Sequence, residues 1–153
     1  MREERGAAWV AAQMPLELLV AVCGWLGPRL PKRGRARRRR VGLAVMLSGL
    51  AGLAWSGATL GRNLTPFPRP RQDGELVVTG PFGLTRHPIY TFNVVAAIGY
   101  GLFRDRLLVL LATVPLAVVL WYKAGAEERW LSRQFPQYAT YRTRVRRLLP
   151  GVC

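Results

Sequence analysis

The sequence predicts an all-α polytopic membrane protein with about four transmembrane helices, ending in a helical hairpin and a cytosolic amphipathic tail helix. Half of the 153 residues are apolar, and they gather in long runs that arginine-rich segments separate. This distribution is typical of a chain that crosses a bilayer several times rather than of a soluble core. Because the net charge of +15 belongs to the segments between these runs, we expect anionic lipid headgroups, and not nucleic acid, as the partner of the arginines.

Residues 1–60 are predicted to form an N-terminal transmembrane pair, with spans at 7–26 and 41–60. The first span contains Glu17, a carboxylate that must face the bundle interior or a wet cavity. The second span has no charge, and its glycines at 42, 49, 52 and 57 would let a neighbouring helix approach closely. Between the spans, residues 28–40 carry eight positive charges and no acid, so we expect a basic loop in water or among headgroups.

Residues 61–87 are predicted to be an irregular connector, because prolines alternate with arginines in its first part. Residues 76–78 are expected either to pair as a brief strand or to lie flat on the headgroups. Pro88 suits the first position of a helix, which puts His87 at or beside its N-cap, where the helix dipole disfavours a protonated imidazole. A neutral His87 could both donate and accept hydrogen bonds, although Arg-His-Pro could equally be a plain polar helix start.

Residues 88–122 are predicted to be a transmembrane hairpin, because only residues 104–106 separate two apolar helices. The hairpin returns the chain to the membrane face of His87, where residues 123–153 follow as a helix ending near 134–136 and a basic amphipathic tail. Neighbouring helix positions point about 100° apart, so one of Glu127 and Glu128 is expected to face the hairpin and the other solvent or Lys123.

The residue types exclude several kinds of chemistry. No Ser-His-Asp set, nucleotide-binding glycine pattern or set of metal ligands is present, so no metal site is expected. Cys23 and Cys153 are expected to be inert thiols. An anion-favouring helix start beside a carboxylate suits a zwitterionic ligand, and S-adenosylmethionine is one such ligand.

Four motifs in the second half of the chain carry a family resemblance. They are Leu76-Val77-x-x-Gly80-Pro81-Phe82, Arg86-His87-Pro88-x-Tyr90, Glu127-Glu128, and Phe135-Pro136-x-Tyr138-x-x-Tyr141 with the following Arg144-Val145 and Pro150. In these residues the chain resembles the isoprenylcysteine carboxyl methyltransferases and their phospholipid-methylating relatives, over residues 76–150. Phe92 departs from the family, which usually has glycine there, and Phe82 lacks the hydroxyl of the usual tyrosine.

The resemblance implies an S-adenosylmethionine site in a cleft between the hairpin and the tail, with a lipophilic acceptor entering from the bilayer. The acceptor would be the carboxylate of a prenylcysteine-like compound or the amine of a lipid headgroup. The implied cofactor contacts are Glu75, Leu76, Val77, Phe82, His87, Pro88, Ile89, Tyr90 and Glu127. Lys123 is the implied substrate contact, and the implied catalytic residues are Arg86, His87 and Glu128. His87 and adjacent amides would hold the donor's carboxylate or adenosine, and one glutamate its ammonium.

The expected location is a bacterial inner membrane, with multiple crossings and the site facing the cytosol. This orientation puts residues 29–40 outside, against the positive-inside tendency, unless one early segment is interfacial or re-entrant. Two other functions stay open on the sequence: a membrane reductase that uses NADPH, and a non-enzymatic scaffold that binds lipid or a partner. The oligomeric state is left open.

Overall fold

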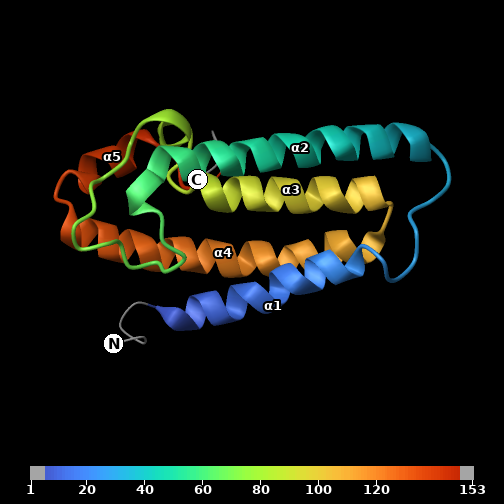
Figure 1. The fold of residues 1–153 in the computed structure, drawn as a ribbon, viewed down its shortest axis with the longest axis horizontal. Coiled ribbons are helices and arrows are strands. Elements are labelled where there is room, and N and C mark those ends of the chain that lie inside the picture. Colours follow the sequence, from blue (N-terminus) through green and yellow to red (C-terminus); the bar gives the residue numbers. More distant parts are fainter. Residues whose placement is uncertain (1–5, 149–153) are drawn as a thin grey trace.

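The chain forms a bundle of long helices joined by loops, in a computed structural model that describes residues 6–148. The four long helices run antiparallel in chain order, and a short fifth helix lies at one end of the bundle (Figure 1). Their bounds are α1 (Ala7–Cys23), α2 (Arg35–Leu60), α3 (Pro88–Arg104), α4 (Leu107–Gln134) and α5 (Tyr138–Arg144), with short 3₁₀ turns η2 (Gly61–Asn63) and η3 (Gly80–Gly83). Residues 6–148 contain no strand, so the all-helical prediction is confirmed. Of the two alternatives for residues 76–78, the brief strand is not formed.

Two helices within residues 6–148 are long and apolar enough to cross a membrane. They are α4 and the segment Arg35–Asn63, which joins α2 to η2. Helices α1 and α3 have 17 residues each, and about 1.5 Å per residue makes them shorter than a bilayer core of roughly 30 Å. The structure therefore supports two candidate spans of the four predicted.

Helices α2 and α3 approach closely because glycine replaces side chains between them. A Cβ at Gly49 would lie 2.6 Å from the Ala96 nitrogen, and a Cβ at Gly99 would lie 2.2 Å from the Met46 nitrogen. Gly42 and Gly52 of α2 also face α3, so the predicted close approach is confirmed there, whereas Gly57 has nothing nearer than 4.0 Å.

Phe92 occupies the position where the family usually has glycine. Its ring packs on Gly52, where an added Cβ would lie 2.4 Å from the ring carbons. The missing glycine in α3 is thus matched by a glycine in α2, and the two helices still pack closely.

We expect Gly99→Ala to lower the free energy of unfolding by about 1–3 kcal/mol, because its methyl group would overlap backbone atoms of α2. Gly57→Ala is the matched control, because no atom lies closer than 4.0 Å to the added methyl group. In a helix, alanine is more favourable than glycine by up to about 1 kcal/mol. Thermal melting in detergent should therefore shift in opposite directions for the two variants. A Gly99→Ala protein as stable as the wild type would contradict the close approach.

The apolar core lies where α4 packs against α1 and α3. Val109, Leu116 and Leu120 of α4 are buried there against Val20 of α1 and Ala97 of α3. The α3–α4 connection is Asp105-Arg106, as short as the sequence predicted. Many large apolar side chains on the outside of the bundle are exposed, including Leu18, Leu47, Leu111 and Val118, as expected for a surface that contacts lipid.

Both ends of the bundle differ from the prediction. Residues 35–40 are the first turns of α2 rather than loop, so the predicted basic loop at 28–40 is shorter. This loop lies at the opposite end of the bundle from the start of α3, and both early helices run between the two ends (Figure 1).

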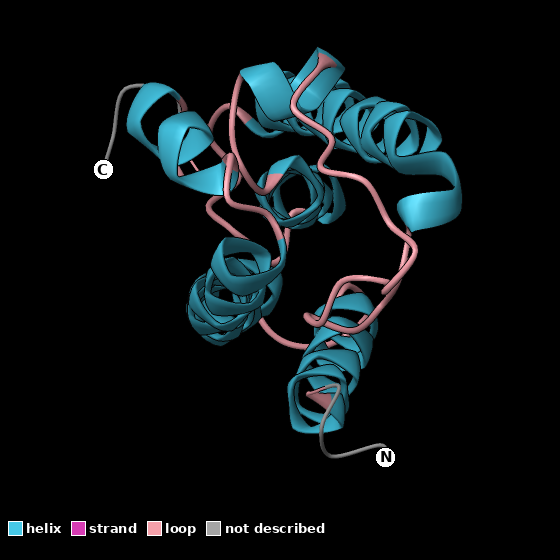
Figure 2. Ribbon diagram, turned by 90° about the vertical axis from the view of Figure 1, so that its left-hand side faces the viewer, coloured by secondary structure: helices cyan, strands magenta, loops and turns pink. Residues whose placement is uncertain are grey.

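The tail also differs from the prediction, because helix α5 ends at Arg144 and residues 145–148 continue without helix. Pro150 of the last motif and Cys153 lie outside the described residues. Figure 2 views the end of the bundle where the connector of residues 61–87 crosses.

Candidate active site

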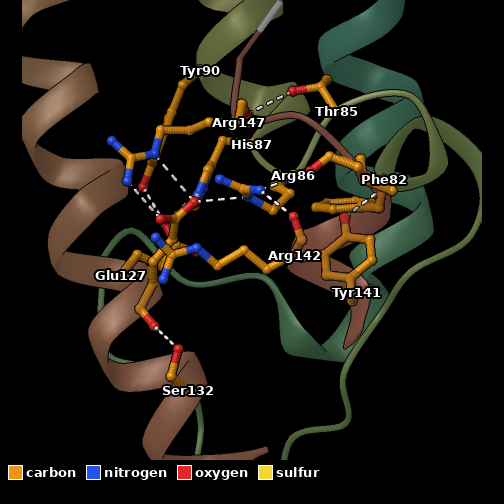
Figure 3. Close-up of polar contacts among 12 residues, drawn as sticks. Phe82, Thr85, Arg86, His87, Tyr90, Glu127, Ser132, Tyr141, Arg142 and Arg147 are labelled. Atoms are coloured by element: carbon orange, nitrogen blue, oxygen red, sulfur yellow. Dashed lines mark hydrogen bonds and ion pairs between the residues drawn. The ribbon is translucent and has the colours of Figure 1, made fainter. Parts of the chain in front are cut away.

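His87 lies at the N-cap of α3, with Pro88 at the first helical position as predicted. The preceding turn η3 begins at Gly80, whose φ of 58° is a left-handed conformation that glycine adopts without strain. The Tyr141 hydroxyl of α5 donates a hydrogen bond to the Phe82 carbonyl and joins this turn to the tail (Figure 3). The start of α3, the last turns of α4 and α5 thus meet at one end of the bundle.

Residues 145–148, here called the strap, pair with the Arg-His-Pro turn. The Arg86 amide donates to the Arg146 carbonyl over 2.8 Å, and the His87 amide donates to the Arg147 carbonyl over 3.1 Å. Thr85 and Thr91 add side-chain hydrogen bonds to strap carbonyls. These two amides were expected to hold the carboxylate or adenosine of the cofactor, but the strap already occupies them.

Glu128 is the centre of a buried ion-pair network. Its Oε1 accepts a hydrogen bond from Arg86 Nε over 2.9 Å, and its Oε2 accepts one from an Arg147 terminal nitrogen over 2.7 Å. His87 Nε2 lies 3.4 Å from Glu128 Oε1, and only 4% of the Glu128 side chain is exposed. Both oxygens are therefore occupied by groups of the protein.

Glu127 contacts the other edge of the same imidazole. Its Oε2 accepts a hydrogen bond from the Tyr90 hydroxyl over 2.7 Å and lies 3.5 Å from His87 Nδ1. The rings of His87 and Tyr90 stack with centroids 5.4 Å apart. Glu128 is buried against the hairpin, while 28% of the Glu127 side chain stays exposed in the cavity that Lys123 also lines. The sequence did not indicate that both glutamates would contact His87.

The two carboxylates determine the protonation of His87. Burial disfavours the imidazolium, but hydrogen bonds and charge attraction from Glu127 and Glu128 outweigh burial, so the pKa of His87 lies above its usual value. The helix dipole, which led us to expect a neutral ring, is the weaker influence here. A protonated His87 donates to both carboxylates and holds them in place.

We expect the protonated His87 to contribute stability that is complete below about pH 6.5, the usual histidine pKa, and that is lost as the pH rises through the higher folded value. The melting temperature of the wild type should therefore fall relative to that of His87→Gln between about pH 6 and 9. Melting curves in detergent across this range measure the difference. Parallel pH profiles for the two proteins would contradict the charge assignment.

A cavity of about 450 Å³ opens beside Glu127, within the size range of roughly 300–1,000 Å³ usual for small-molecule sites. It lies between α1, the connector and the hairpin, and the tail forms one wall. The cleft was expected between the hairpin and the tail alone, so α1 and the connector are additional walls. Of the residues that the sequence analysis singled out, the cavity is lined by Glu75, Leu76, Val77, Phe82, Arg86, His87, Pro88, Ile89, Tyr90, Lys123 and Glu127. Glu128 does not line it.

Lys123 contributes an ammonium group to the same cavity. Its Nζ donates to Gln13 Oε1 over 2.6 Å and to the Pro66 carbonyl over 3.0 Å. Glu17 accepts from Gln13 and Asn93 and also lines the cavity, as its position in an apolar span required. An ammonium group has three N–H donors, so one donor of Lys123 is available to a ligand.

Two residues at the site had weak signals or none in the sequence. Tyr138 lines the cavity, and its buried hydroxyl has no hydrogen-bond partner among residues 6–148. Its place in the Phe-Pro-x-Tyr motif was the one signal for it. Burial raises the pKa of Tyr138, so the phenol stays a neutral donor. Arg147 had no signal, because it is one of 23 basic residues and no spacing distinguishes it.

The fold and the site together define an all-helical, membrane-associated protein with a ligand cavity at one end of its bundle. A family model described as phospholipid methyltransferase matches residues 38–138, and the chain belongs to this family. The match covers α2 from its fourth residue, covers α3 and α4 in full, and reaches the first residue of α5.

Two curated proteins are similar to the chain. A nickel-cobalt-cadmium resistance protein of Alcaligenes xylosoxydans xylosoxydans is 34% identical over 72% of this chain and 52% of its own length. A cobalt-zinc-cadmium resistance protein of Cupriavidus metallidurans is 33% identical over 76% of this chain and 55% of its own length. The chain thus spans about half the length of the curated relatives it matches. No solved structure matches it significantly.

Proposed function

We propose that the protein is an integral membrane methyltransferase that uses S-adenosylmethionine to methylate a lipophilic acceptor. The observation that supports this most directly is the convergence of Tyr90, Lys123 and Glu127 on one cavity with largely apolar walls, in a phospholipid methyltransferase family chain. When bound, S-adenosylmethionine supplies a methyl group on a positively charged sulfur, whose displacement needs positioning and exclusion of water more than strong acid or base groups.

The residues of the cavity suit this methyl donor. The part-exposed Glu127 carboxylate would pair with the ammonium of S-adenosylmethionine, and the unpartnered Tyr138 hydroxyl would donate a hydrogen bond to an acceptor atom of the same ligand. The apolar side chains of Leu76, Val77 and Phe82 would cover the adenosine. A buried donor group without a partner is costly, so a ligand that accepts from Tyr138 would be favoured.

We assign Arg86 and Glu128 positioning roles rather than contact with the reacting groups. Their ion pair joins the start of α3 to α4, and the Glu128 side chain is occupied by protein donors. His87 lies between the two glutamates and orients Glu127 toward the cavity. These residues would keep Glu127, the partner of the S-adenosylmethionine ammonium, in place during methyl transfer.

The acceptor would lie beside α1. Lys123 has one donor left for an acceptor carboxylate, and the apolar side chains of Val10 and Met14 line the same cavity where a lipophilic chain would lie. A carboxylate reacts without losing a proton, whereas a headgroup amine must be deprotonated first. The geometry therefore favours a carboxylate acceptor over an amine.

We further propose that α2 and α4 cross a bacterial inner membrane, with the cavity end in the cytosol, where the methyl donor is available. This orientation puts residues 29–40 on the outer side. The eight positive charges of these residues go against the positive-inside tendency, and the total of 13 basic residues on the cytosolic side of this topology against ten outside offsets them only narrowly.

The direct test is methyl transfer from radiolabelled S-adenosylmethionine by the detergent-purified chain, with a total lipid extract and a membrane-protein fraction as parallel acceptors. We expect base-labile label, which identifies a methyl ester, and its loss in Glu127→Gln but not in Asp73→Asn, an exposed acid outside the cavity. Base-stable label would identify an amine acceptor instead. No transfer to either fraction, together with stabilisation by NADPH, would overturn the proposal in favour of a reductase.

A further inference from the structure

The end of the bundle opposite the cavity is a fixed framework rather than a loose basic loop. The Leu30 amide donates to the Asp105 carbonyl over 3.1 Å, and Arg29 pairs with Arg106 as an isolated antiparallel bridge. The α1–α2 loop is thereby joined to the α3–α4 connection. Backbone positions of the arginines at this end are consequently set by hydrogen bonds.

One buried carboxylate organises this end. Asp105 has only 3% of its side chain exposed and pairs with Arg35 over 2.6 Å and with Arg38. These two pairs join the start of α2 to the hairpin connection. The single acid is fully used by Arg35 and Arg38, so it leaves the other arginines of this end uncompensated.

A second cavity, of about 190 Å³, lies within this framework, and its lining includes Arg29, Arg39, Arg104 and Arg106. No carboxylate of the described part of the chain forms an ion pair with any of these four side chains. Two of them are nevertheless held in place by the protein. Arg104 donates to the Gly24 carbonyl over 3.0 Å, and Arg106 donates to the Gly27 carbonyl.

We propose that this arginine cavity binds the phosphate group of an anionic ligand. Guanidinium groups match phosphate oxygens with paired hydrogen bonds, and several converge here. Asp105 also lines the cavity, but its carboxylate is paired with Arg35 and Arg38. The neighbourhood favours a lipid phosphodiester, because Trp25, whose ring contacts the Arg104 guanidinium, and Leu26 are 64% and 54% exposed beside it. Tryptophan is common where headgroups meet the apolar core of a bilayer. Free phosphate offers the same chemistry, and the experiment separates the two sources.

The test measures thermal stabilisation of the detergent-purified chain as a function of added short-chain phosphatidylglycerol, phosphatidylcholine or inorganic phosphate. Its key variant is Arg29→Gln with Arg39→Gln, two cavity side chains that donate no hydrogen bond within residues 6–148. The matched control is Arg37→Gln with Arg40→Gln, which removes the same charge from exposed positions outside the cavity. This pair of variants separates a site from general charge attraction.

We expect phosphatidylglycerol to stabilise the wild type more than phosphatidylcholine, with its apparent affinity reduced roughly tenfold or more in the cavity variant and little changed in the control. Competition by inorganic phosphate would support a site for the phosphate group itself, and its absence would support a lipid headgroup as the ligand. Equal losses in the two variants, or no preference for phosphatidylglycerol, would overturn the proposal.

Discussion

Replacing Glu128 by glutamine is expected to lower the free energy of unfolding by about 3–5 kcal/mol, the usual effect of removing one partner from a buried ion pair. Glutamine keeps the shape of the side chain but not its charge, so Arg86, His87 and Arg147 would lose the carboxylate that they share. Arg86 has only 9% of its side chain exposed and could not recover its hydration. The strap would then be held to the Arg-His-Pro turn by backbone hydrogen bonds, the two threonine hydroxyls and the hydrogen bond from the Arg86 guanidinium to the Val145 carbonyl.

Two measurements test this expectation. The melting temperature in detergent should fall clearly for Glu128→Gln and stay unchanged for Asp73→Asn, whose ion pair with Arg71 is exposed. Trypsin should also cleave the variant faster within residues 142–147, where four of six residues are arginine, because the strap opens more often. A Glu128→Gln protein that melts and resists trypsin like the wild type would show that the network does not hold the strap.

Replacing the neighbouring Glu127 by glutamine is expected to weaken binding of S-adenosylmethionine by at least about 30-fold, because the ammonium of the donor would lose a charged partner in a partly desolvated cavity. The effect on folding should be small. The glutamine carbonyl can still accept the hydrogen bond of Tyr90, and more than a quarter of the Glu127 side chain is exposed.

Isothermal titration with S-adenosylmethionine measures the first effect, and thermal melting measures the second. The two glutamates are adjacent in sequence, so the two variants can also show whether their roles are exchanged. If Glu127→Gln unfolded the protein while Glu128→Gln only weakened binding, the roles that we assign to the two carboxylates would be wrong.

The order of the helices could be predicted from the sequence because local signals are strong there. Proline and glycine frame the turn before His87, and three polar residues separate two apolar runs too closely for anything but a hairpin. The start of α2 was misjudged for a local reason as well. Five arginines within residues 35–40 indicated a solvated loop, but arginine favours helix, and Asp105 from the hairpin connection pairs with Arg35 and Arg38.

The sequence predicted which residues form the site, but not the hydrogen bonds and ion pairs that connect them. Tyr90, Lys123 and Glu127 all line the cavity, and the sequence analysis named each of them. The network around Glu128 depends on Arg147, 19 positions further along the chain, and on a strap whose pairing with Arg86 spans about 60 residues. No helical period or motif spacing marks contacts of this kind. The occupation of the Arg86 and His87 amides by the strap therefore emerged only from the structure.

Equilibrium binding of radiolabelled S-adenosylmethionine to Val77→Trp and Val78→Trp proteins tests whether the cavity beside Glu127 holds the methyl donor. Val77 lines the cavity and the exposed Val78 does not, so the same bulky side chain is added one residue apart. We expect saturable binding to the wild type and to Val78→Trp, and its loss in Val77→Trp. Absence of saturable binding to the wild type, or equal binding by the two variants, would show that this cavity is not the site of the methyl donor.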